Sequence, residues 1–202
     1  MFIGEWNKSV IITYIGTIFA VIGIFMVFDG KVSEAYGALI IAGVCDMLDG
    51  TIARKCKRNE SQKLFGIQID SLADVIGFVV FPVILACGSG LNRWYHIPVM
   101  CLFCICGIAR LAYFNMNCGG EEGPCKYYQG LPVTFTAIIL PLVYPLHLVM
   151  KEAVFGIMYT ILFIVIAFFN ILNIKVIKPK GAACGILCFL ALIMVIVYWG
   201  IL

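Results

Sequence analysis

Charged side chains are scarce in this sequence of 202 residues: they make up only 12% of it, and no stretch between the apolar runs is long enough for a soluble domain. A soluble domain usually carries about a quarter charged residues, so that class is excluded. Hydrophobic residues make up 63% of the chain and form runs of about 20 residues, the length of a membrane-spanning helix. Barrel strands would instead alternate over about 10 residues. The sequence predicts an all-α, polytopic transmembrane bundle that forms a single domain over residues 1–202.

Lysine and arginine are unevenly distributed along the chain. Seven candidate spans are predicted, at residues 9–28, 34–54, 66–88, 94–115, 131–150, 153–174 and 182–201. With a cytoplasmic N-terminus, eleven cations fall on the cytoplasmic side and only Lys31, Arg93 and Lys151 on the other. Positive residues favour the cytoplasmic face. We therefore expect a multi-pass protein of the cell membrane whose basic face suits anionic lipid head groups and phosphates, not nucleic acid.

Histidine is almost absent, and the positions of the cysteines do not indicate a disulfide scaffold. His96 and His147 fall towards the outer face, so neither is assigned to catalysis. Seven of the ten cysteines lie in or at the ends of predicted spans. The remaining three fall on the cytoplasmic side, where thiols stay reduced. We interpret the cysteines as small apolar side chains that fill space between helices.

Four aspartates lie within two consecutive predicted spans: Asp46, Asp49, Asp70 and Asp74. A carboxylate in hydrocarbon costs about 2.5–3.5 kcal/mol even on the mildest insertion scale, so four need compensation. The first pair is spaced i, i+3 and the second i, i+4, so each pair lies on one helical stripe. Two antiparallel helices, joined by a basic loop predicted over residues 55–65, would gather all four near the cytoplasmic surface. Divalent cations are the favoured partners, because hard cations bind carboxylate oxygens.

Small residues and one arginine accompany the aspartates. Gly50, Ala53 and Gly66 lie on the same stripes, where small side chains leave room for a ligand or a neighbouring helix. Arg54 follows directly after Ala53 and places a cation beside the predicted metals. Metal ions together with a guanidinium suit a diphosphate group.

This stretch resembles the signature of the CDP-alcohol phosphotransferase family, whose members displace CMP from a CDP-linked lipid with an alcohol. The matching positions are Asp46, Asp49, Gly50, Ala53, Arg54, Gly66, Asp70 and Asp74. The resemblance implies two divalent ions, Mg²⁺ or Mn²⁺, held by the four aspartates, with Asp74 also acting as general base. It implies that CDP and its diphosphate contact Asp49, Gly50, Ala53, Arg54 and Gly66, and that the protein is a homodimer. Eleven residues, 55–65, separate Arg54 from Gly66 where the family usually has eight, so we expect a longer loop.

Two further segments resemble the phosphatidylserine synthase branch of this family: GIARLAYFN at 107–115 and YYQGLPVTFTA at 127–137. The likeness implies CDP-diacylglycerol as donor and L-serine as acceptor. Arg110 could bind the serine carboxylate through a bidentate pair. Asn115, Gln129 or backbone carbonyls could accept from the ammonium group, and Gly130 is placed in the same predicted acceptor site.

Other acceptors and other classes of protein remain as alternatives. Glycerol 3-phosphate, inositol or an inositol phosphate would use the same chemistry. The phosphorylated acceptors would need a second basic cluster, which Lys55, Lys57, Arg58 and Lys63 could supply. A divalent-cation transporter would need polar residues that continue to the outer face. The outer halves of the second and third spans, AYGALIIAGV and IGFVVFPVIL, are apolar, so conduction is disfavoured. A catalytically inactive subunit is not favoured either, because all eight motif positions are present.

Overall fold

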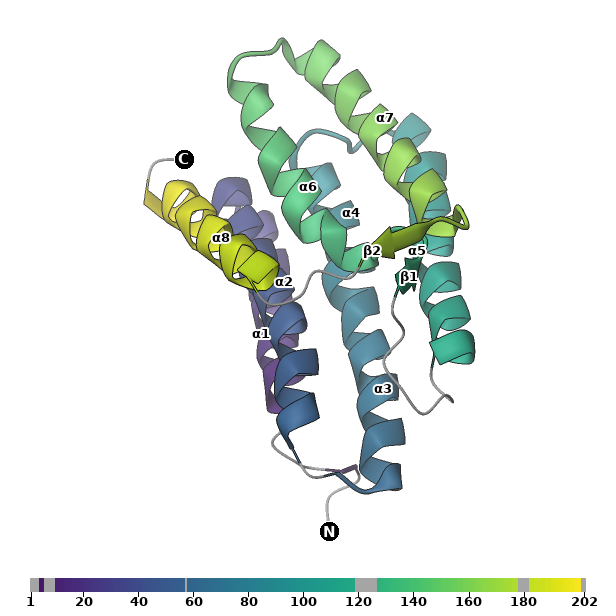
Figure 1. Ribbon diagram of the computed structural model, residues 1–202. Helices are drawn as coiled ribbons and strands as arrows, with labels where there is room; N and C mark the ends of the chain where they lie inside the picture. The colour runs from purple at the N-terminus through teal and green to yellow at the C-terminus, as the bar shows by residue number, and fades with distance from the viewer. Residues whose placement is uncertain (1–3, 6–9, 57, 119–126, 178–181, 201–202) are drawn as a thin grey trace.

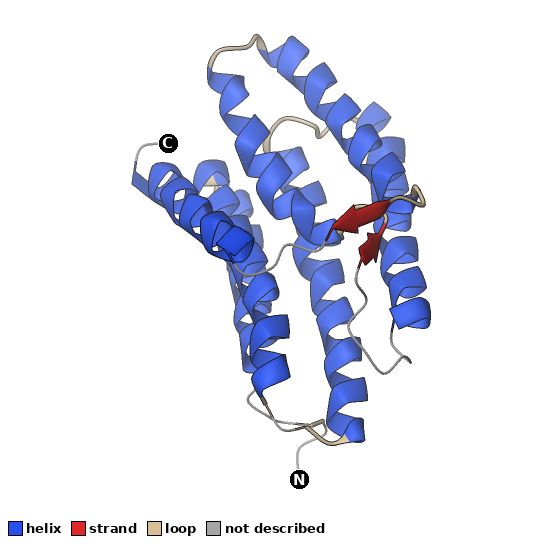
Figure 2. Cartoon of the chain, viewed as in Figure 1, coloured by secondary structure: helices blue, strands red, loops and turns tan. Residues whose placement is uncertain are grey.

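The computed structural model describes residues 4–5, 10–56, 58–118, 127–177 and 182–200, and these residues are almost entirely helical (Figures 1 and 2). The prediction of an all-α polytopic bundle is confirmed. The α-helices are α1 (Ile11–Phe28), α2 (Val32–Lys55), α3 (Glu60–Asp74), α4 (Phe81–Gly88), α5 (Ile97–Cys118), α6 (Thr136–Val143), α7 (Glu152–Ile171) and α8 (Ala182–Gly200). A π-helical segment, η1 (Val75–Val80), joins α3 to α4, and short 3₁₀ turns, η2 (Trp94–His96), η3 (Val133–Phe135) and η4 (Tyr144–Leu148), flank α5 and α6.

Five helical stretches within the described ranges are long and apolar enough to cross a membrane: Ile11–Phe28, Val32–Ala53, Glu60–Gly88, Trp94–Met116 and Glu152–Ile171. The two remaining predicted spans correspond to shorter apolar helices, Val133–Leu148 and Gly185–Gly200. The protein is therefore a membrane protein, and its backbone polar groups are satisfied within helices, as a lipid environment requires.

α2 is the central helix of the bundle, in contact with α1, α6 and α8. Glycine permits the close approach of α2 to α6: a Cβ atom on Gly43 would lie 2.6 Å from the Cβ of Ala137. Away from the aspartates the core is aromatic. Four tyrosines, Tyr36, Tyr144, Tyr159 and Tyr198, group together there, and the hydroxyls of Tyr36 and Tyr159 lie 2.7 Å apart.

The predicted loop over residues 55–65 is wrong, because α3 already begins at Glu60. A capping box explains this start. The Asn59 side chain accepts a hydrogen bond of 2.8 Å from the Gln62 backbone N–H, and the Gln62 side chain accepts one of 3.2 Å from the Asn59 N–H. Such reciprocal bonds satisfy the free donors of a first helical turn. The additional residues therefore lengthen α3, and only residues 56–59 connect it to α2.

A short antiparallel ribbon, which the sequence did not predict, joins two remote segments. β1 (Tyr127–Gln129) pairs with β2 (Lys175–Ile177), with Tyr128 opposite Val176. Two more bonds continue the contact: Gly130 N–H donates to Ile174 O and Leu131 N–H to Phe169 O, both at 2.9 Å. The ribbon thus holds the start of the α6 segment against the end of α7, while α3 and α5 extend past it in Figure 1.

Candidate active site

The four predicted aspartates come together between α2 and α3, which run side by side in Figure 1. The carboxyl groups face one another across the two helices, Asp46 with Asp74 and Asp49 with Asp70. This order is the one that antiparallel helices impose. Asp49 and Asp74 are buried and the other two are half-buried.

The donor set suits a hard divalent cation. Ligand oxygens of Asp46, Asp49 and Asp70 all lie within 4.8 Å of one another, and Asp74 adjoins this group next to Asp46. Carboxylates this close repel one another unless a proton or a cation lies between them. Oxygen-only donors are those that Mg²⁺ and Mn²⁺ prefer. The residues present therefore fit a divalent metal ion.

A small cavity connects the aspartates to α1, the helix at the start of the chain. Its volume is about 20 Å³, which is room for roughly one water molecule. Residues of α1, α2, α3 and η1 line it: Thr13, Gly16, Thr17, Ala42, Asp46, Asp49, Ala73, Asp74, Gly77 and Phe78. The buried Thr13 hydroxyl donates a hydrogen bond of 3.1 Å to Oδ2 of Asp49. Sequence reasoning missed Thr13, because one threonine in an apolar span carries no signal of its partner.

The backbone widens directly after Asp74, where η1 begins. π-Helical segments are rare and frequently mark functional sites. Here the wider turns change which side of the continuous helix faces inward. They leave Asp74 at the end of the carboxylate stripe, and Gly77 and Phe78 of η1 close the cavity beyond it.

The predicted nucleotide surface is open and carries a cation. A Cβ atom on Gly50 would meet nothing within 4 Å, and one on Gly66 would lie 3.4 Å from Nη1 of Arg58. The Nε atom of Arg58 is buried and has no hydrogen-bond partner among the described residues. Ala53 is half-buried on the same stripe, whereas the side chain of Arg54 lies outside the described atoms. The sequence suggested Arg58 only as part of a basic cluster for a phosphorylated acceptor and did not place it beside Gly66.

Of the predicted acceptor residues, Arg110 has a direct electrostatic interaction with the aspartates. It is buried on α5 and interacts electrostatically with Asp46 and Asp74. Its guanidinium carbon lies 5.2 Å from the centre of the Phe114 ring, a cation–π contact that fixes the side chain. The guanidinium of Arg110 therefore lies within electrostatic range of the carboxylate cluster, and its predicted role in binding the serine carboxylate stays a prediction.

The other predicted acceptor residues have structural contacts. The Asn115 amide donates a hydrogen bond of 2.8 Å to Ser71 Oγ, which ties α5 to α3. Gly130 has a φ of +72°, and a Cβ there would collide with the carbonyl oxygen of Asn170. This position favours glycine for its conformation and for its packing. Gln129 is half-buried in β1, without a described contact to the aspartates.

Comparison with known proteins agrees with this geometry. The sequence matches the CDP-alcohol phosphatidyltransferase family over residues 6–201. The chain belongs to this family. It is 38% identical over 112 residues to the CDP-diacylglycerol–serine O-phosphatidyltransferase of Saccharomyces cerevisiae, covering 52% of this chain and 40% of the relative. It is 37% identical over 120 residues to the archaetidylserine synthase of Methanothermobacter thermautotrophicus, covering 59% and 49%.

A third relative is the CDP-diacylglycerol–serine O-phosphatidyltransferase of Helicobacter pylori, which is 38% identical over 108 residues and is covered for 43% of its length. The chain thus matches less than half the length of each of these relatives. Serine appears in the names of all three relatives, with a phosphatidyl group in two of them and an archaetidyl group in the third.

Proposed function

We propose that this protein transfers the phosphatidyl group of CDP-diacylglycerol to L-serine, forming phosphatidylserine and releasing CMP. The observation that carries the proposal is the position of Arg110, buried beside a cluster of four aspartates that bears the family signature. Family membership supports the phosphotransfer chemistry. The names of three relatives support serine as the acceptor.

The aspartates are proposed to hold two divalent ions, Mg²⁺ or Mn²⁺, with Asp46, Asp49, Asp70 and Asp74 as the ligands. When bound, the metal would neutralise the diphosphate and stabilise the leaving CMP. The open surface at Gly50, Ala53 and Gly66 is proposed to receive CDP, with Asp49, Arg54 and Arg58 beside its phosphates.

In the proposed reaction the hydroxyl oxygen of serine attacks the phosphorus that bears diacylglycerol. A new P–O bond forms to serine, the bond from this phosphorus to the bridging oxygen breaks, and CMP leaves with that oxygen. The hydroxyl proton passes to the carboxylate of Asp74. Phosphoryl transfer depends mainly on positioning and charge stabilisation, which rigid helices supply well.

The two cations lie at different positions along α3, one near its middle and one at its C-terminal end, which supports a division of the site. Arg58 lies at Gly66, whereas Arg110 acts on Asp74, eight residues or about 12 Å further along the helix. The first position is proposed to bind the nucleotide and the second the acceptor. A guanidinium binds a carboxylate through two parallel hydrogen bonds. We therefore propose that the serine-binding site is formed by Arg110, Asn115, Gln129 and Gly130.

The membrane setting follows from the same proposal. The lipid tails of the donor would enter from the bilayer, and serine from the cytoplasm, where the N-terminus and the basic residues are placed by charge distribution. The proposed location is the cell membrane. A homodimer is proposed from the family resemblance alone.

A CMP-release assay on the protein purified in detergent tests the function. CDP-diacylglycerol and Mn²⁺ are supplied with serine, glycerol 3-phosphate or inositol. We expect release stimulated by serine and not by the other two. Release with another alcohol would retain the phosphotransferase and reject the serine assignment. No release with any acceptor or metal would reject the enzymatic function.

A further inference from the structure

Asn170 is a buried polar residue with unmet hydrogen-bonding capacity. It lies in the last turn of α7, is 2% exposed, and neither Oδ1 nor Nδ2 has a hydrogen-bond partner within the described part of the chain. Each buried donor or acceptor left unpaired costs about 1–3 kcal/mol, and native structures contain few of them. The other residues on this buried stripe of α7 are Phe155, Tyr159, Phe163, Ile166 and Ala167. An apolar side chain would continue that stripe without the cost.

The packing of α5 against α7 puts Arg110 and Asn170 beyond the same aromatic contact, towards the same end of the helix pair. His96 lies 3.2 Å from Thr160, and the Phe103 and Phe163 rings are 5.0 Å apart, so the two helices run in the same direction. Seven residues beyond the phenylalanine pair, two helical turns on each helix, are Arg110 and Asn170.

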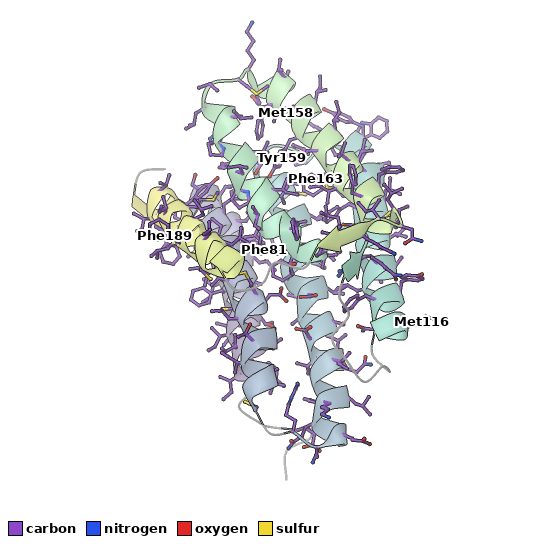
Figure 3. The ribbon with its side chains drawn as sticks, in the orientation of Figure 1. Phe81, Met116, Met158, Tyr159, Phe163 and Phe189 are labelled. Carbon is purple, nitrogen blue, oxygen red and sulfur yellow. The ribbon has the colours of Figure 1, made fainter. Side chains whose placement is uncertain are left out.

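Both of these polar residues are buried. Figure 1 shows α5 and α7 side by side, and Figure 3 labels Tyr159 and Phe163 on the stripe that leads to Asn170. The aromatic stripe between the two helices therefore ends in a guanidinium on one helix and an amide on the other.

Asn170 also adjoins the other predicted acceptor segment. Its carbonyl oxygen packs against Gly130, and the neighbouring Phe169 carbonyl accepts a hydrogen bond from Leu131 N–H. Asn170 thus packs against Gly130 and lies, like Arg110, two turns beyond the Phe103–Phe163 contact; the sequence assigns both Gly130 and Arg110 to the acceptor site. Asn115, the amide predicted for this role, is already bonded to Ser71.

We propose that Asn170 binds the amino-acid end of the acceptor, an inference that rests on the proposed function. Oδ1 accepts a hydrogen bond from the serine ammonium group, and Nδ2 donates one to the carboxylate that Arg110 also binds. A carboxamide presents an acceptor and a donor side by side, as a zwitterionic α-amino acid requires. Glycerol 3-phosphate and inositol lack the ammonium group, so Asn170 also selects against them.

Asn170→Leu tests the role, because leucine has a similar shape and no polar atoms. We expect the KM for serine to rise at least about tenfold, as for the loss of a hydrogen bond to a charged group. The KM for CDP-diacylglycerol should stay within about twofold, and the midpoint of thermal unfolding should stay equal or rise, because an unpaired buried amide is removed. Thr160→Val is the matched control: it removes a polar group from the same helix, at the His96 contact, and should leave the serine KM unchanged.

Asn170→Ala, assayed by equilibrium binding of labelled L-serine in the presence of CDP and Mn²⁺, provides a second measurement if the leucine variant does not fold. Weaker serine binding with unchanged CDP binding is expected. If the wild type responds to serine and the Asn170 variants bind serine as tightly as the wild type does, only the role of Asn170 is overturned. An equal rise in both KM values with a lower unfolding midpoint would also overturn only that role. A wild type with no response to serine would overturn the proposed function and this inference together.

Discussion

The hydrogen bond from Thr13 to Asp49 predicts that removal of the Thr13 hydroxyl weakens metal binding by a measurable factor. Thr13→Val removes the hydroxyl and keeps the β-branched shape, so the packing of α1 against α2 is retained. A hydrogen bond to a charged group contributes about 1.5–3 kcal/mol. The 3.1 Å distance between Thr13 Oγ1 and Asp49 Oδ2 is longer than the usual 2.7–2.8 Å, so we expect the lower end of that range. That energy corresponds to about a tenfold loss in affinity for the metal, within the range found when groups that orient metal ligands are removed.

The assay is serine-dependent CMP release as a function of Mn²⁺ concentration. The half-saturating Mn²⁺ concentration should rise about tenfold in Thr13→Val, while kcat at saturating Mn²⁺ recovers most of its original value. Thr17→Val is the matched control, since Thr17 lines the same cavity but bonds to the carbonyl of Thr13. Thr13→Ser should behave as the wild type. An unchanged Mn²⁺ dependence in Thr13→Val, or the same shift in Thr17→Val, would refute the reasoning.

Four other substitutions test the separate roles. Asp74→Asn should lower kcat by roughly 10²–10⁴-fold and leave binding of CDP, measured by calorimetry, largely intact; lost CDP binding would make Asp74 a ligand only. Arg110→Lys should raise the KM for serine more than that for CDP-diacylglycerol, because a lysine cannot form the bidentate pair; equal effects would indicate a structural role. Arg58→Gln should raise the KM for CDP-diacylglycerol and not for serine, and the reverse pattern would place Arg58 at the acceptor. Gly130→Ala should lower the thermal unfolding midpoint, because the new Cβ collides with the Asn170 carbonyl; an unchanged midpoint would contradict that packing.

The carboxylate cluster was predictable because its information is local. Asp46 and Asp49 share one helical stripe, Asp70 and Asp74 share another, and a short connection makes the two helices antiparallel. These facts suffice to pair the carboxyl groups. The start of α3 was also readable, although the prediction missed it: asparagine at residue 59 and glutamine at residue 62 form a capping box.

The remaining parts of the site depend on contacts between remote segments. Thr13 and Asn170 lie near opposite ends of the chain in apolar helices, and their own neighbours in sequence do not show which groups they meet. The ribbon of β1 and β2 has only three residues in each strand, too few for an alternating pattern to be recognised. The π-helical turns after Asp74 have no composition that distinguishes them from an ordinary apolar helix.

The central claim is that serine itself attacks the phosphorus of the CDP-linked lipid beside the four aspartates. The most direct test supplies CDP-diacylglycerol, Mn²⁺ and serine labelled with ¹⁸O in its hydroxyl group, and analyses both products by mass spectrometry. The account predicts phosphatidylserine that retains the label and CMP that carries none, with neither product formed by Asp49→Asn. Absence of labelled phosphatidylserine, or its undiminished formation by Asp49→Asn, would contradict the account.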